Sequence, residues 1–229
     1  MPGSKFWNFI KDAAQPEEAE LFLWGPISTS VWWGDEVTPQ QFRDDLKALG
    51  GVKKITVRIN SPGGDVFAAE SISGMLRDSK AEIIAQIEGY CASAATIIAS
   101  NADKIRISAG SMYLIHDPMT NVSGNIKDLQ EAIDFLLKGK EMLIETYTAR
   151  TGLSHDEIFS MMEATTKLTG REAVEMKFAD ELIEVEPGPM AAIKAYSVSM
   201  AAMYASMQAT EPQPNELDTL RAELELLSL

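Results

Sequence analysis

Residues 83–99 read IIAQIEGYCASAATIIA, an apolar run, a glycine and then a second run of small and apolar residues. This order predicts a buried strand, a tight turn and a helix. A serine at that junction, Ser93, lies where the first amides of a helix have no intrahelical acceptor. Its small neighbours permit the close backbone approach that an exposed nucleophilic serine requires. Taken alone, the pattern favours a serine that only caps the helix.

A second junction of the same kind comes earlier in the chain. Residues 54–60 alternate between apolar and polar side chains, which predicts a strand, and they lead into NSPGGD at 60–65. A helix is expected over 66–76, so the glycine pair lies where free amides converge at a positive helix end. This turn can be an oxyanion hole or a plain strand–helix connection. A phosphate-binding loop is disfavoured, because the lysine and the following hydroxyl residue of that motif are missing.

Strands and helices continue to alternate along the chain, which predicts an α/β fold. The other expected strands are 20–24, 104–107 and 112–115, and the other expected helices are 39–49, 93–100, 125–150, 154–163 and 169–176. The longest helix, 125–150, carries apolar residues on more than one face. It is therefore expected to be buried on two sides or to reach another subunit.

The chain has 229 residues, 45% of them hydrophobic, and a net charge of −14. This size predicts one domain with an appendage: an N-terminal extension (1–19), a compact domain (20–186) and a helical or partly disordered tail (187–229). The acidic balance, with no cluster of Lys or Arg, argues against a nucleic-acid surface. No apolar run is long enough for a signal sequence or a membrane span, so we expect a cytoplasmic protein.

The single cysteine and the two histidines differ in what their positions predict. Cys91 lies among apolar residues and is expected to be a buried packing residue. His116 follows the expected strand 112–115 and precedes a proline turn, at the strand end where site residues of α/β sheets gather. His155 lies beside two acidic residues at a polar helix start, where it is expected to be solvated.

Three motifs occur in the order of one family: NSPGG at 60–64, Ser93 in a Gly-x-x-Ala-Ser frame, and LIHDP at 114–118. The chain resembles the proteolytic subunit of Clp peptidases from about residue 21 to residue 184. Within that family it looks closest to the phage and prophage branch, the Clp-related head-maturation proteases. The resemblance implies a crotonase-like spiral of ββα units, with the helix at 125–150 interlocking two rings.

The resemblance also implies roles for site residues, with no metal and no cofactor. Ser93 would be the nucleophile and His116 the general base. The backbone amides of Gly64 and Ala94 would hold the oxyanion. An imidazole that takes the serine proton and returns it to the leaving amine divides peptide hydrolysis into acylation and deacylation.

The third member of the family's triad is where this sequence departs. Alignment on LTGREAVE at 168–175 puts the acidic position at Thr165, which carries no charge. A threonine hydroxyl can hold the imidazole tautomer but cannot stabilise an imidazolium. The acidic residues Glu163, Asp117 and Asp180 remain alternatives. We therefore expect either weak peptidase activity or activation on assembly.

The resemblance predicts a serine endopeptidase inside a ring-shaped homo-oligomer, with stacked heptamers as the family's usual form. Its partners would be protein or peptide substrates, capsid or scaffold proteins, and an ATPase unfoldase. Three alternatives stay open: a ring-forming subunit without activity, a crotonase-fold acyl-CoA enzyme, and a serine–lysine dyad with Lys167. The absence of a charge at Thr165 is what favours the inactive subunit.

Overall fold

A computed structural model describes residues 5–11, 15–28 and 39–183 of the chain. The predicted C-terminal tail, 187–229, lies outside the described residues. Contacts group residues 1–185 into one compact unit, which contains every described element. None of the helices in the described ranges combines the length and the apolar character needed to cross a bilayer.

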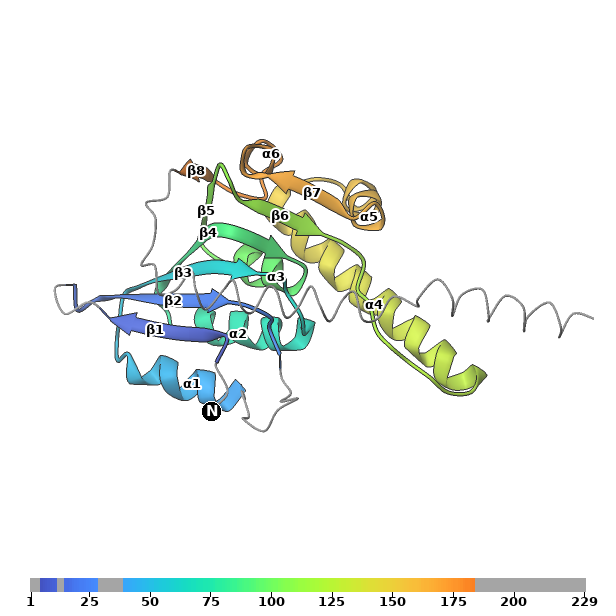
Figure 1. Ribbon diagram of the computed structural model, residues 1–229, viewed down its shortest axis with the longest axis horizontal. Helices are drawn as coiled ribbons and strands as arrows, with labels where there is room; N and C mark the ends of the chain where they lie inside the picture. Colours follow the sequence, from blue (N-terminus) through green and yellow to red (C-terminus); the bar gives the residue numbers. More distant parts are fainter. Residues whose placement is uncertain (1–4, 12–14, 29–38, 184–229) are drawn as a thin grey trace, which may run out of the picture. The chain divides into compact units, whose positions relative to one another are not determined.

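The described residues form eight strands and six helices (Figure 1). The strands are β1 (Trp7–Lys11), β2 (Glu18–Trp24), β3 (Lys54–Ser61), β4 (Glu82–Ala92), β5 (Lys104–Ser108), β6 (Met112–Ile115), β7 (Thr166–Thr169) and β8 (Glu181–Ile183). The helices are α1 (Pro39–Ala48), α2 (Val66–Asp78), α3 (Ala94–Ser100), α4 (Ile126–Thr151), α5 (His155–Glu163) and α6 (Gly170–Glu175). The strands and helices expected within the described residues are all present, whereas β1, β7 and β8 were not expected.

The strands form one sheet that divides at β4. Strands β2, β3, β4, β5 and β8 run parallel in that order, and β1 adds an antiparallel edge next to β2. Strand β4 pairs with β5 through residues 84–87 and with β6 through residues 90–92. Strand β6 then pairs antiparallel with β7. The carboxyl ends of β4 and β6 and the start of β7 therefore meet at one end of the sheet.

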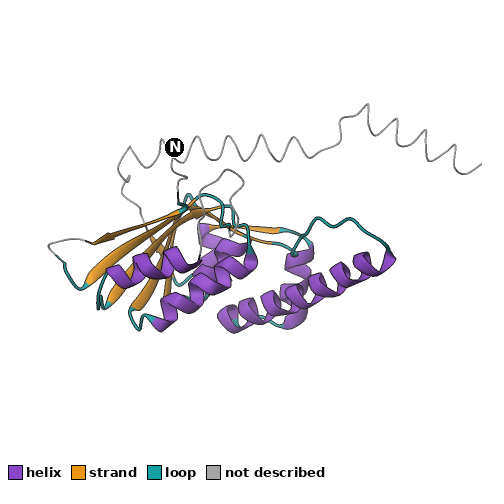
Figure 2. Ribbon diagram, turned by 90° about the horizontal axis from the view of Figure 1, so that it is seen from below, coloured by secondary structure: helices purple, strands orange, loops and turns teal. Residues whose placement is uncertain are grey.

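Helices α1, α2 and α3 cover one face of the sheet (Figure 2). Every second residue of β2 and β3 is buried against them, as the alternating pattern of residues 54–60 predicts. Asp65 caps α2 by accepting a hydrogen bond from the Ala68 amide (2.9 Å). Burial of these apolar faces fixes the register of β3 and β4, and with it the turns that follow both strands.

Helix α4 has two halves with different surroundings. It starts with a capping box between Asn125 and Asp128 and ends at Gly152, which has a φ of 75°. Its C-terminal half buries Leu143, Ile144 and Tyr147, among others, whereas apolar side chains of the N-terminal half are exposed. Contact of the N-terminal half with another subunit stays a prediction.

Residues 7–11, which fall within the predicted N-terminal extension, form strand β1 and pair with β2. The indole of Trp7 is buried, packs against Phe42 and donates a hydrogen bond to Asp45 (2.9 Å). Five residues with mixed periodicity gave no strand signal. The pairing depends on contacts with α1, which lies far along the chain.

Candidate active site

Ser93 sits in a strained turn between β4 and α3. Its backbone has a φ of 53° and a ψ of −127°, a conformation that costs a residue with a side chain about 1–3 kcal/mol. Such strain persists only where the surroundings hold it. The Ser93 side chain makes no capping hydrogen bond to α3. The helix-cap interpretation therefore does not describe this side chain.

Hydrogen bonds from two other elements hold the Ser93 backbone. The Ser93 amide donates to the Leu114 carbonyl in β6 (3.0 Å). The Ser93 carbonyl accepts from the amide (2.9 Å) and the hydroxyl (2.6 Å) of Thr96. The Tyr147 hydroxyl of α4 lies 2.6 Å from the Thr96 hydroxyl. Because Thr96 gives its one proton to Ser93, Tyr147 must be the donor to Thr96.

The two glycines after β3 differ in their backbone amides: one amide donates a hydrogen bond, and the other is free. The buried Ser61 hydroxyl accepts from the Gly63 amide (3.1 Å), and the Gly63 carbonyl accepts from the Ile27 amide (2.8 Å). The Gly64 amide has no acceptor among the described residues. Gly64, and not Gly63, is therefore the glycine whose N–H is free for a ligand.

The glycine turn packs directly against the serine turn. A Cβ added to Gly63 would lie 2.4 Å from the Ala92 carbonyl oxygen, 2.7 Å from the Ser93 Cβ and 2.8 Å from the Ala94 nitrogen. Gly64 directly follows Gly63 in the glycine turn, and Ala94 directly follows Ser93 in the serine turn. Ala94 is the first residue of α3, and its amide also lacks an acceptor in the described part of the chain.

We expect Gly63→Ala to disrupt this contact. The new methyl group would overlap backbone atoms, and the φ of 90° at this position disfavours alanine. The expected loss of stability is about 1–3 kcal/mol by thermal unfolding, and reaction of Ser93 with a fluorophosphonate should slow at least about tenfold. Gly51→Ala is the matched control, because a Cβ there meets nothing within 4 Å. Wild-type reactivity in Gly63→Ala would contradict the predicted contact.

His116 follows β6 at the same end of the sheet. The parallel pairing of Ala92 with Leu114 puts Ser93 level with Ile115, the residue before His116, so both Ser93 and His116 follow the ends of neighbouring strands. The imidazole is half-buried, and its Nδ1 lies 2.5 Å from the Asp117 carbonyl oxygen. A carbonyl only accepts, so Nδ1 carries the proton and Nε2 of the neutral ring is an acceptor. Within the described residues the Ser93 hydroxyl makes no hydrogen bond to this ring, a bond that often forms only with substrate bound.

Thr165 lies opposite His116 when the register of β6 and β7 is extended by one residue. The antiparallel pairing of β6 and β7 puts Ile115 opposite Thr166, so the positions beyond this pair are His116 and Thr165. The Thr165 backbone has a φ of 52°, and its side chain is exposed. Its hydroxyl has no partner among the described residues. The strand register thus places Thr165 next to the histidine, without a hydrogen bond between the two side chains in the described part of the chain.

The acidic alternatives to Thr165 have other partners or lie elsewhere. Asp117 forms an ion pair with Lys140 of α4 (2.9 Å). Asp180 forms an ion pair with Arg150. Glu163 is the exposed last residue of α5. No acidic side chain in the described part of the chain hydrogen-bonds to the imidazole of the site.

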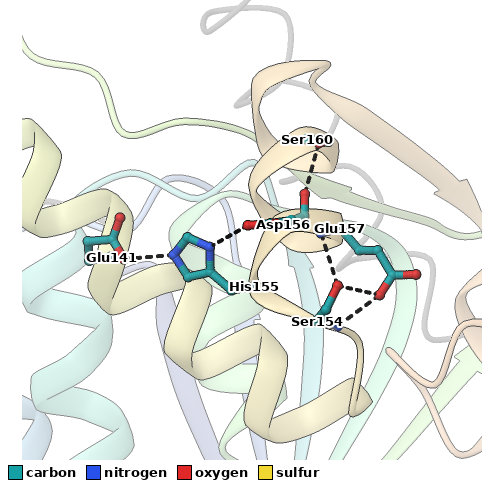
Figure 3. Close-up of polar contacts among 6 residues, drawn as sticks. All are labelled: Glu141, Ser154, His155, Asp156, Glu157 and Ser160. Atoms are coloured by element: carbon teal, nitrogen blue, oxygen red, sulfur yellow. Dashed lines mark hydrogen bonds and ion pairs between the residues drawn. The ribbon is translucent and has the colours of Figure 1, made fainter.

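The second histidine has acidic partners from α4 and α5 (Figure 3). His155 opens α5 and is exposed, with hydrogen bonds to Glu141 (3.0 Å) and Asp156 (3.3 Å). These two carboxylates, Glu141 first, raise the pKa of His155. Ser154 and Glu157 form the capping box of the same helix. His155 is therefore a solvated helix-start residue, as the sequence predicts.

Two other side chains have groups that could react, the thiol of Cys91 and the amine of Lys167. Cys91 is fully buried, and this burial raises the pKa of its thiol, so it is the packing residue that the sequence predicts. Lys167, the candidate for a serine–lysine dyad, is an exposed residue of β7 opposite Leu114. The described residues contain no cluster of side chains suited to hold a metal ion.

Sequence reasoning missed three parts of this site. The Ser61 hydroxyl accepts a hydrogen bond from the Gly63 amide, and the Asp117 carbonyl accepts one from the His116 imidazole. Lys140 forms an ion pair with the Asp117 carboxylate. The NSPGG motif contains the first of these as an unexamined serine. The second joins adjacent residues but depends on the conformation of the loop after β6, and the third joins residues 23 positions apart, so no local pattern reveals either.

Comparison with known proteins places the chain in a family. A family model described as Clp protease matches residues 24–186. Over 167 residues the chain is 28% identical to the ATP-dependent Clp protease proteolytic subunit of Streptococcus pneumoniae strain 70585, and 29% identical to that of strain Hungary19A-6. Both alignments cover 71% of this chain and 83% of the relative. With the mixed α/β, crotonase-like fold described above, these matches show that the chain belongs to the Clp protease family.

Proposed function

We propose that this protein is a serine endopeptidase in which Ser93 is the nucleophile and His116 the general base. The relatives, named as proteolytic subunits, support a peptidase. The observation that carries the serine mechanism is the strained Ser93 turn. Its hydroxyl is not used as a helix cap, and it lies against a glycine turn whose next amide is free.

In this mechanism the Ser93 oxygen attacks the peptide carbonyl while its proton passes to Nε2 of His116. The amides of Gly64 and Ala94 donate hydrogen bonds to the oxyanion that forms. His116 then gives the proton to the leaving amine, and the acyl group stays on Ser93. Water attacks this ester by the same route in reverse order, with His116 again as base. The carbonyl of Asp117 keeps the ring tautomer that both steps require.

The proposal includes a ring-shaped homo-oligomer that works in the cytoplasm and encloses the sites. The exposed apolar residues of α4 support an interface there, since a contiguous apolar surface of this kind usually contacts another chain. Ile126, for example, is 88% exposed. Stacked heptamers and an ATPase unfoldase follow from the resemblance to the Clp family, and capsid or scaffold proteins as substrates follow from the resemblance to its phage and prophage branch. Mass photometry of the purified chain measures the stoichiometry.

A fluorophosphonate probe tests the serine mechanism directly. The purified chain is treated with the probe, digested and mapped by mass spectrometry, and a parallel sample is incubated with an unfolded protein such as casein. We expect the probe to modify Ser93 alone and this modification to be lost in His116→Ala. We also expect the wild type to cleave casein. Modification of another residue, or none together with intact casein, would refute the proposal.

The same experiment separates a second candidate, a ring-forming Clp-fold subunit without activity. The observation that favours it is Thr165, which places no charge beside His116. Such a subunit would assemble but would leave both probe and casein unchanged. An acyl-CoA enzyme on the same fold would instead turn over a thioester without Ser93, since that chemistry uses the oxyanion amides and an acid.

A further inference from the structure

Lys140 is a buried cation that the proposed chemistry of Ser93 leaves unused. It lies in the middle of α4 and is 8% exposed. Its ammonium donates to Asp117 Oδ2 (2.9 Å) and lies 3.6 Å from the centre of the Phe159 ring. Burial of a charged amine is costly unless the charge is paired, so these contacts define where the lysine sits.

Asp117 connects this lysine to the catalytic base. Its carboxylate accepts from Lys140, and its carbonyl accepts from Nδ1 of His116 (2.5 Å). The other carboxylate oxygen, Oδ1, is buried with no partner in the described part of the chain. The position of Asp117 therefore depends on Lys140 alone among the charged groups described.

The helix backbone also touches this segment. A Cβ added to Gly139, the neighbour of Lys140, would lie 3.7 Å from Pro118 Cγ, which is an ordinary packing distance. The chain after β6 thus runs along α4, as Figure 1 shows. The loop that carries the imidazole-binding carbonyl therefore lies close to α4 at both Asp117 and Pro118.

We propose that Lys140 is a positioning residue for His116. Through its ion pair it fixes Asp117, and the Asp117 carbonyl then holds the proton on Nδ1 and leaves Nε2 free to face Ser93. The arrangement supplies the orientation that a triad carboxylate would give, at a position where the strand register offers only Thr165. The inference rests on the proposed function, because it assigns His116 the role of base.

The first test compares Lys140→Met with Lys138→Met. Lys138 is an exposed lysine of the same helix, so both variants lose one positive charge and gain one methionine. Loss of the ion pair should displace the carbonyl, and kcat for a fluorogenic peptide should fall about ten- to a hundredfold with KM nearly unchanged. Lys140→Arg should retain more of kcat than Lys140→Met. A kcat of Lys140→Met within twofold of the Lys138→Met value would overturn the proposal.

A double-mutant cycle tests whether Lys140 acts through Asp117. Asp117→Asn keeps the carbonyl and removes the ion pair, so it should lower kcat like Lys140→Met. The double variant should then be no slower than either single one, because both changes break the same interaction. Effects that multiply would overturn the inference. If Lys140→Met fails to fold, a wild-type kcat in Asp117→Asn would overturn it as well.

A spectroscopic readout separates this inference from the proposed function. Nitrogen chemical shifts of the His116 ring report its tautomer, and His155→Gln removes the only other histidine signal. The expected result is a proton on Nδ1 in the wild type and in Lys138→Met, and a mixture of tautomers in Lys140→Met. A proton on Nε2 in the wild type overturns the inference. A chain that is inert to fluorophosphonate and casein but shows the Lys140-dependent tautomer would refute only the peptidase.

Discussion

Ser93→Ala is expected to lower kcat for peptide hydrolysis by up to about 10⁶-fold, the loss measured when the catalytic serine is removed from a serine protease with a complete triad. The residual rate would come from the two oxyanion amides and from substrate binding. His116→Ala should cost about as much, because the base and the nucleophile act in one step. The variant that lacks both side chains should be no slower than Ser93→Ala. Hydrolysis of a fluorogenic peptide, followed at enzyme concentrations high enough to detect the residual rate, measures all three.

Ser93→Gly serves as the control that links this loss to the strained turn. Glycine accepts the φ of 53° without strain, so this variant should unfold at a higher temperature than Ser93→Ala while being equally inactive. Mass photometry checks that assembly is unchanged in each variant. Retention of most of the hydrolysis in Ser93→Ala would show that the nucleophile lies elsewhere. An unfolding temperature of Ser93→Gly below that of Ser93→Ala would show that the turn is not strained in solution.

The sequence predicts the long repeating elements of the fold because their signals are local. The alternation in β3 and the capping residue of α2 lie within a few positions of each other, and so do the glycine turn and the helix that follows it. Strands β7 and β8 have four and three residues and, unlike the equally short but wholly apolar β6, they contain no apolar run that marks a strand. They become strands because β6 and β5 offer unpaired edges, which is a property of the folded sheet.

In the candidate site too, the sequence predicts the residues that have local signals and misses the contacts between distant elements. The sequence is enough to propose Ser93, His116 and Gly64 as site residues, because each lies in a local motif that indicates its role. That His116 and Thr165 adjoin follows only from the register of β6 and β7. The ion pair that holds Asp117 joins residues 23 positions apart, and no periodic signal connects them. Contacts between elements, unlike turns and caps, have to be observed.

Thr165→Asp is expected to raise kcat, and the gain should be large. In the chymotrypsin-type triad, loss of the carboxylate lowers kcat about 10⁴-fold, and that figure is an upper bound for what its restoration can give here. We expect about ten- to a thousandfold, because the Asp117 carbonyl already holds the tautomer and only the charge is missing. An aspartate next in register to His116 would stabilise the imidazolium that forms as Ser93 attacks.

Thr165→Asn is the matched control for this gain. The backbone at this position has a φ of 52°, which a β-branched threonine disfavours and which both asparagine and aspartate tolerate better. Both variants should therefore gain similar stability by thermal unfolding, and only the aspartate should gain kcat. Equal kcat in the two variants would show that backbone strain, and not the missing charge, limits the wild type. If neither variant nor the wild type cleaves peptide or reacts with fluorophosphonate, the serine peptidase proposal is wrong and the alternative of a subunit without activity is favoured.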